Sequence, residues 1–219
     1  MMGFSDGNQK PMNPHIIIPD ELYLSEDVVG LARDMIGKLL IKRNENDLMV
    51  SVITETEAYA GETDRASHAW NGRRTARTEV MYSNGGVCYV YLCYGMHHLL
   101  NIVTAPEGIP HAVLIRSILP LSGFDSVKKT KTGAKNLIKS GIGPGRLTRL
   151  LGIDMKYNGQ SLCDGEKIWI EDCGLNFKEF IAVTKRIGID YAGADAELPY
   201  RFVVESEIAD REIKKAGLF

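Results

Sequence analysis

The run VCYVYLCY at residues 87–94 constrains the fold more than any other segment of the chain. It is rich in valine and tyrosine, which fit a pleated and partly buried surface. It ends at Gly95 and Met96, where the chain can turn back, and residues 99–104 then form a second apolar run. Two such runs joined by a short turn predict a β-hairpin and a fold based on antiparallel strands.

Apolar runs elsewhere predict further strands, and two segments have helical spacing. Ser25 is typical of a helix N-cap, and apolar residues recur at helical spacing from there to about Lys38. A loop and a helix pair are expected over 128–152, and a long loop with short helices over 62–83. Further strands are predicted at 39–43, 48–59 and 112–118 and around Ile168, Val183 and Phe202.

This mixture predicts an α/β mixed (α+β) fold: one compact domain on a largely antiparallel curved sheet with a protruding β-hairpin. A chain of 219 residues is long enough for one sizeable core and short for two complete domains. We expect residues 1–14 to form a flexible N-terminal tail and residues 15–219 to form the single domain.

The sequence favours neither a membrane protein nor a secreted one. No apolar run approaches the roughly 20 residues that span a bilayer, so no membrane partner is expected. The first 14 residues lack the hydrophobic segment of a secretion signal. We expect a cytoplasmic protein, associated with the nucleoid if the source is bacterial.

The cysteines and histidines argue against a metal centre or an iron–sulfur cluster. The four cysteines form no CxxC pair, and the five histidines show neither HxH nor HExxH spacing. The segment GIGPGR at 141–146 matches neither the P-loop nor the dinucleotide fingerprint. Neither a metal nor a nucleotide cofactor is therefore expected.

Basic residues gather in two places, although the net charge is −2. A charge run is most often a solvated face, but two clusters beside glycine-rich loops favour a surface that faces phosphates. Arg73, Arg74 and Arg146 are the candidates for contacts to a DNA backbone. The first cluster is Arg73, Arg74 and Arg77, and the second is Lys128, Lys129, Lys131, Lys135, Lys139, Arg146 and Arg149.

Two carboxylates, Glu55 and Glu57, stand near the end of an apolar strand. Strict period-two alternation places them on one face with Ile53 and Tyr59. Glutamates in this position are most often paired with a cation or exposed to solvent. The functional interpretation is a general base beside an aromatic wall.

The predicted hairpin carries several tyrosines. Tyr89 and Tyr91 share one face of the strand, while Tyr94 lies on the other face beside the turn. Core packing is the default role of tyrosines in a strand. A large aromatic at a hairpin tip, however, suits a wedge that is inserted at a base step of DNA.

Together these segments resemble the alkyladenine (3-methyladenine) DNA glycosylase family. The resemblance covers most of the chain from about Ile16 to Ser206, and the matching segments occur in the order of the family. The segments are TETEAYAGETDRASHAWNGRRTART (54–78), VCYVYLCYGMHHLLNIV (87–103), AVLIRSILPL (112–121), GIGPGRLTRLLGI (141–153) and RIGIDYAG (186–193).

The resemblance implies a role for each matching position in the chemistry. Glu57 matches the glutamate that activates the attacking water, and Arg116 matches the arginine that helps to hold this water. Tyr94 matches the residue that fills the gap left by the flipped nucleotide.

The resemblance also implies a base pocket. Tyr59 and Tyr91 match its aromatic walls, and His68 faces them with its backbone amide toward the base edge. Asn101 matches an asparagine that clashes with the 2-amino group of guanine. Because alkylated purines such as 3-methyladenine are positively charged, we expect the electron-rich pocket to attract them by cation–π interaction.

The implied activity is hydrolysis of the N-glycosidic bond of an alkylated or deaminated purine that is flipped out of double-stranded DNA, which leaves an abasic site. A monomer without a metal or organic cofactor is expected. The substrates implied, in no order, are 3-methyladenine, 7-methylguanine, hypoxanthine and ethenoadenine.

Three alternatives are weaker. A non-catalytic lesion sensor needs no Glu57 with Arg116, and a nucleotide- or RNA-processing enzyme of the same fold needs no wedge such as Tyr94. A bifunctional glycosylase/lyase needs an amine nucleophile, and no pocket motif contains a lysine.

Overall fold

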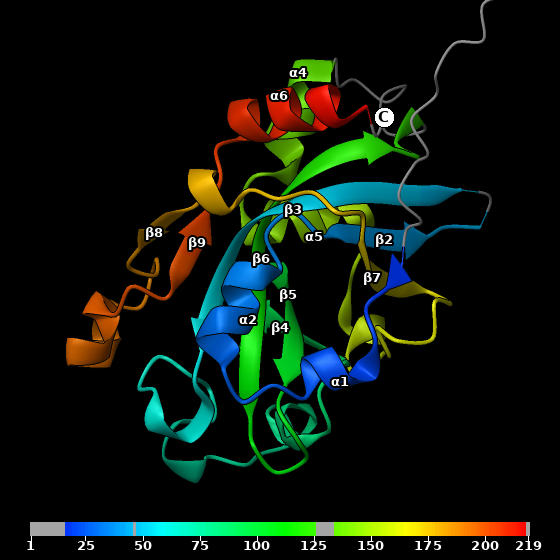
Figure 1. Ribbon diagram of the computed structural model, residues 1–219. Helices are drawn as coiled ribbons and strands as arrows, with labels where there is room; N and C mark the ends of the chain where they lie inside the picture. Colours follow the sequence, from blue (N-terminus) through cyan, green and yellow to red (C-terminus); the bar gives the residue numbers. More distant parts are fainter. Residues whose placement is uncertain (1–15, 46, 126–133, 218–219) are drawn as a thin grey trace, which may run out of the picture.

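Nine antiparallel strands form one sheet in the computed structural model, which describes residues 16–45, 47–125 and 134–217 (Figure 1). The strands follow one another across the sheet in the order β1-β7-β2-β3-β6-β5-β4, and β9 pairs with both β3 and β8. Their bounds are β1 Ile16–Ile17, β2 Leu39–Arg43, β3 Leu48–Tyr59, β4 Cys88–Cys93, β5 His97–Thr104, β6 His111–Ser122, β7 Ile168–Asp172, β8 Ala182–Thr184 and β9 Arg201–Val203. This mixed, largely antiparallel architecture confirms the predicted fold class.

The long strand β3 organises the sheet and extends across the molecule in Figure 1. One edge pairs with β6, while the other edge pairs first with β2 and then, at Glu55–Glu57, with β9. Register shifts, one between Ile53 and Glu55 and one between Glu55 and Thr56, mark β-bulges in the β3–β6 pairing. The predicted placement of Ile53 on the face of the two glutamates is therefore wrong, because Ile53 belongs to the main core. Glu55, Glu57 and Tyr59 do lie together, since Arg116 contacts both carboxylates and the Tyr59 hydroxyl donates to Glu57.

Strands β4, β5 and β6 lie side by side and separate the core from the site (Figure 1). One set of alternating side chains, which includes Val90, Leu100 and Ile115, belongs to the main core. The other set faces a cavity and includes Tyr91 and Leu114. Alternation along a pleated strand thus gives each of these strands one structural and one functional face.

Helix α2 (Val28–Asp34) contributes Val28 and Leu31 to the core and lies over β3 and β6 in Figure 1. Its N-cap is Asp27, whose side chain accepts a hydrogen bond from the amide of Gly30 at 2.8 Å, so the predicted cap at Ser25 is wrong. The helix also ends before Lys38, because Gly37 adopts a φ of 90° and donates to the carbonyl of Ile53.

The described residues form four further α-helices: α1 Asp20–Tyr23, α4 Ala134–Gly141, α5 Pro144–Leu151 and α6 Ser206–Ala216. The predicted helix pair is present as α4 and α5, and the long loop holds short 3-10 helices at 61–63, 70–72 and 79–82. The expected tail at 1–14 lies outside the described residues, as do Lys128, Lys129 and Lys131 of the second basic cluster. None of the described helices is long and apolar enough to cross a membrane.

Candidate active site

A cavity of about 400 Å³ lies between the β4–β5–β6 surface, the loop after β3 and the segment 187–191. Its volume suits one flat ligand of the size of a nucleobase. The predicted site residues that line it are Tyr59, His68, Tyr91, Tyr94, Asn101 and Arg116. Tertiary folding therefore brings together residues that are widely separated in the sequence.

Glu57 is not among the residues that line this cavity, and its side chain is 0% exposed, but its three partners Tyr59, Arg116 and Ile187 all line it. Its Oε2 accepts a hydrogen bond from the Tyr59 hydroxyl at 2.8 Å and lies 3.3 Å from Nη1 of Arg116. Its Oε1 accepts the backbone N–H of Ile187 at 2.8 Å. Both carboxylate oxygens are thus held by donors, as a buried carboxylate requires.

The pKa of Glu57 is raised because burial disfavours its charged form. The positive charge of Arg116 and the hydrogen bonds from Ile187 and Tyr59 oppose this rise and favour the ionised carboxylate. The pKa of Tyr59 is raised well above its ordinary value by burial and by the neighbouring Glu57, so the phenol keeps its proton and remains a donor. The arrangement suits a general base, whose pKa is best placed closer to neutrality than that of a free glutamate.

Arg116 connects two carboxylates, since its Nε also donates to Oε1 of Glu55 at 2.9 Å. Glu55 accepts further hydrogen bonds from Nε of Arg201 at 2.6 Å and from the hydroxyl of Ser117 at 2.5 Å. Burial raises the pKa of Glu55, but these two hydrogen bonds and the charge of Arg116 outweigh it and lower the pKa. Glu55 is therefore ionised at neutral pH and holds Arg116 against Glu57.

The rings of His68, Tyr89 and Tyr91 are in close contact on one side of the cavity. The ring of His68 meets that of Tyr91 edge-on at 4.6 Å between centroids, and Tyr89 lies 5.4 Å from Tyr91. Nδ1 of His68 is 2.8 Å from the Tyr89 hydroxyl. The side-chain amide of Asn101 donates to the carbonyl of Tyr89 at 3.0 Å, which fixes its orientation beside the cavity.

The opposite wall, Tyr59, is held in place by a buried arginine. The guanidinium of Arg186 lies 4.8 Å from the centre of the Tyr59 ring and 5.3 Å from that of Tyr200. Arg186 forms an ion pair with Asp64 and donates to the carbonyl of Ala58 at 2.8 Å. The Tyr59 wall is thus rigidly supported.

Tyr94 is 87% exposed at the hairpin tip. Its φ of 50° is uncommon for a residue with a large side chain, and Gly95 follows with a φ of 67°. Met96 at the same tip is also exposed. An apolar projection next to a cavity is a surface built to contact another molecule.

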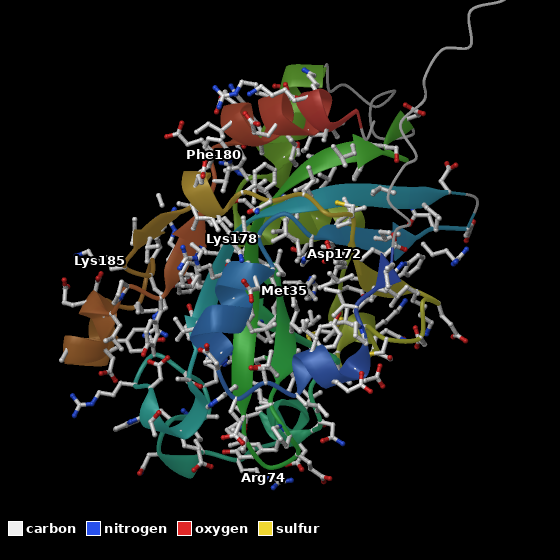
Figure 2. All side chains as sticks on the ribbon, in the orientation of Figure 1. Met35, Arg74, Asp172, Lys178, Phe180 and Lys185 are labelled. Atoms are coloured by element: carbon white, nitrogen blue, oxygen red, sulfur yellow. The ribbon has the colours of Figure 1, made fainter. Side chains whose placement is uncertain are left out.

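The three arginines predicted to contact phosphates differ in whether a carboxylate pairs with them. Arg73 lines a depression that adjoins the cavity at His68 and Tyr191, and Arg146 is exposed on α5. Arg74 instead donates to Glu79 at 2.7 Å and points outward at the edge of the molecule in Figure 2.

Several residues of the site were not assigned a role from the sequence. Ile187 acts through its backbone N–H, so its side chain carries no signal of the function. Asp64 and Arg186 lie in segments that resemble the family, but their pairing depends on a contact across 122 residues. Among the residues that the structure describes, no group of three His, Cys, Asp or Glu side chains could hold a metal.

The comparison with known proteins agrees with this site. The family model described as "Methylpurine-DNA glycosylase (MPG)" matches residues 22–208. The chain belongs to the methylpurine-DNA glycosylase family. The glycosylase is 40% identical over 191 residues to a "Putative 3-methyladenine DNA glycosylase" of Chlamydia abortus. The aligned region covers 86% of this chain and 98% of that protein.

Relatives of the same printed name occur in other bacteria. The protein of Chlamydia pneumoniae is 41% identical over 194 residues, with 87% of this chain and 96% of the relative covered. That of Borreliella afzelii is 41% identical over 187 residues, with coverage of 85% and 95%. The glycosylase is therefore an enzyme of base-excision repair that binds damaged DNA.

Proposed function

We propose that the glycosylase is monofunctional and acts on alkylated or deaminated purines in double-stranded DNA. The purine is flipped into the aromatic cavity, and water activated by Glu57 cleaves the N-glycosidic bond to leave an abasic site. The observation that carries this proposal is the buried Glu57 carboxylate, which is held by Tyr59, Arg116 and the Ile187 amide, three residues that line the cavity.

Base flipping costs a few kcal/mol, and less at a damaged or mispaired base. Stacking on an aromatic side chain returns about 1–3 kcal/mol per base. The walls formed by Tyr59, His68 and Tyr91 therefore offset the cost of extrusion. Tyr94 fills the gap in the duplex, because it is exposed on a stiff hairpin next to the cavity.

Cleavage of the glycosidic bond develops positive charge on the sugar as the base departs. The ionised Glu57 takes a proton from the attacking water and stabilises this charge. Arg116 both lines the cavity and contacts Glu57, so it links the carboxylate to the space around the flipped nucleotide.

Hydrolysis by water is favoured over a lyase reaction. A lyase requires an amine that attacks the sugar. The described residues that line the cavity include Arg77 and Arg116 as cations but no lysine. Because one chain supplies the base, the walls and the wedge, a monomer is sufficient for the reaction.

The proposal is tested by single-turnover base release from duplexes that carry hypoxanthine or ethenoadenine and from methylated DNA. We expect release by the wild type, an intact strand at the abasic site and no covalent adduct with borohydride. Glu57→Gln should bind lesions normally but release bases about 10²–10⁴-fold more slowly. No release by the wild type together with tight lesion binding would favour the non-catalytic sensor, and unchanged release by Glu57→Gln would remove Glu57 from the mechanism.

A further inference from the structure

Arg77 is an exposed residue whose guanidinium lies at the aromatic cavity. It is one of the cavity-lining residues, and its Cζ lies 4.9 Å from the centre of the Tyr91 ring. Its Nη2 lies 3.3 Å from Nε2 of His68. The guanidinium therefore lies over one face of the Tyr91 ring and contacts the edge of the His68 ring.

This contact determines which ring nitrogen of His68 carries the proton. A guanidinium can only donate hydrogen bonds, so Nε2 of His68 must be the acceptor. Nδ1 then carries the proton and donates to the Tyr89 hydroxyl at 2.8 Å. Burial lowers the pKa of His68 to about 4, and the charges of Arg77 and Arg73 lower it as well. His68 is consequently a neutral wall at physiological pH.

Two other arginines near the cavity are paired with carboxylates. Arg116 is paired with Glu55 and Glu57. Arg186, which lies against Tyr59, is paired with Asp64. Arg77 forms no salt bridge with a carboxylate in the part of the chain that the structure describes.

The expectation that the pocket attracts cationic bases by cation–π interaction therefore needs revision. One face of the Tyr91 ring already lies against the protein's own guanidinium, whose positive charge is therefore next to the pocket. A positively charged base brought next to Arg77 meets a like charge, whereas an uncharged base does not.

We propose that Arg77 is a specificity-determining residue that favours uncharged damaged purines, such as hypoxanthine and ethenoadenine, over positively charged alkylated purines. This inference rests on the proposed function, because it assumes that the flipped base enters this cavity. The effect acts through charge and leaves the hydrolytic step at Glu57 unaltered.

The test compares two duplexes of the same sequence, one with 7-methylguanine as the charged base and one with hypoxanthine as the neutral base. The quantity measured is the ratio of their single-turnover release rates, each corrected for release without enzyme. Arg77→Gln should raise the ratio of 7-methylguanine to hypoxanthine release about threefold to tenfold, which corresponds to the loss of one nearby like charge at an exposed site. Arg77→Met, which keeps an apolar stem without the charge, should raise it similarly.

Two control variants separate this effect from general DNA affinity. Arg77→Lys keeps the charge and should keep the wild-type ratio. Arg146→Gln removes an exposed cation on α5 and should change both rates by the same factor, so the ratio stays constant. In addition, an NMR titration of Arg77→Gln should show the pKa of His68 raised above that of the wild type.

An unchanged ratio in Arg77→Gln and Arg77→Met would overturn the inference, even if both rates fell, because a phosphate contact would act on both substrates alike. That result would leave the proposed function intact as long as the wild type releases bases and Glu57→Gln does not. Absence of release by the wild type would overturn both.

Discussion

Arg186 and Asp64 form a fully buried ion pair that joins the segment after β3 to the segment after β8. Besides Arg186, the Asp64 carboxylate accepts the backbone N–H of Ala60 at 3.1 Å and that of Ala66 at 2.9 Å. The pair therefore holds the chain on both sides of the cavity and supports Tyr59 between them.

Removal of Asp64 should strongly destabilise the enzyme. Asp64→Ala leaves a buried guanidinium without its counterion, and the expected loss is about 3–5 kcal/mol of the free energy of unfolding. Urea denaturation monitored by circular dichroism measures it. The neighbouring Lys185→Ala is the matched control, because it breaks an exposed pair with Glu197 and should cost no more than about 1 kcal/mol. A loss below that of the control would show that the pair does not stabilise the fold.

The pH dependence of base release should reflect the ionisation of Glu57. Because burial raises its pKa, the release rate should fall as the pH decreases, with a midpoint above the ordinary value of 4.5. Arg116→Gln removes a charge that lowers this pKa and should shift the midpoint to higher pH. Lys214→Gln, on α6, should leave the midpoint in place. Single-turnover rates across the pH range provide the measurement, and a midpoint at or below 4.5 in the wild type would contradict the assignment.

Tyr94→Ser should weaken binding to a lesion duplex and reduce base flipping. Stacking of one base on an aromatic ring is worth about 1–3 kcal/mol, so the affinity should fall roughly tenfold or more. Titration of a duplex with 2-aminopurine next to the lesion follows both quantities by fluorescence. Tyr94→Phe keeps the ring and should behave like the wild type. Equal affinity and equal fluorescence for Tyr94→Ser would exclude a wedge at this position.

The affinity for DNA should decrease steeply with salt, since phosphate contacts release counterions. Arg146→Gln should reduce the slope of log affinity against log salt by about 1. Arg74→Gln should have a smaller effect, because its charge is already paired with Glu79. Binding assays at several salt concentrations provide the slopes. If Arg74→Gln reduced the slope more than Arg146→Gln, then Arg74 and not Arg146 would be the residue that contacts a phosphate.

Local patterns were sufficient to predict the hairpin and every strand except the two-residue β1. The alternation around Tyr91 and the turn at Gly95 are properties of neighbouring residues, so they can be read without knowledge of the fold. The site residues that line the cavity were predicted from the resemblance to the family, which carries three-dimensional information that the local pattern lacks.

Features that depend on distant contacts were missed. The bulge after Ile53 arises from the pairing of β3 with β6, and the end of α2 depends on a bond between Gly37 and Ile53. The position of Arg77 on Tyr91 requires the fold of the loop, so the sequence showed only a basic cluster. In each case the decisive partner lies outside the window that a local pattern covers.

The N–H of Ile187 reaches Glu57 across 130 residues of chain. During synthesis Glu57, the carboxylate proposed as the general base, is made long before this donor and before the buried Arg186. A nascent or truncated chain that stops short of residue 186 would contain the cavity strands but lack a finished general base. We therefore expect partial chains to be inert toward DNA, so that excision begins only once the polypeptide is nearly whole.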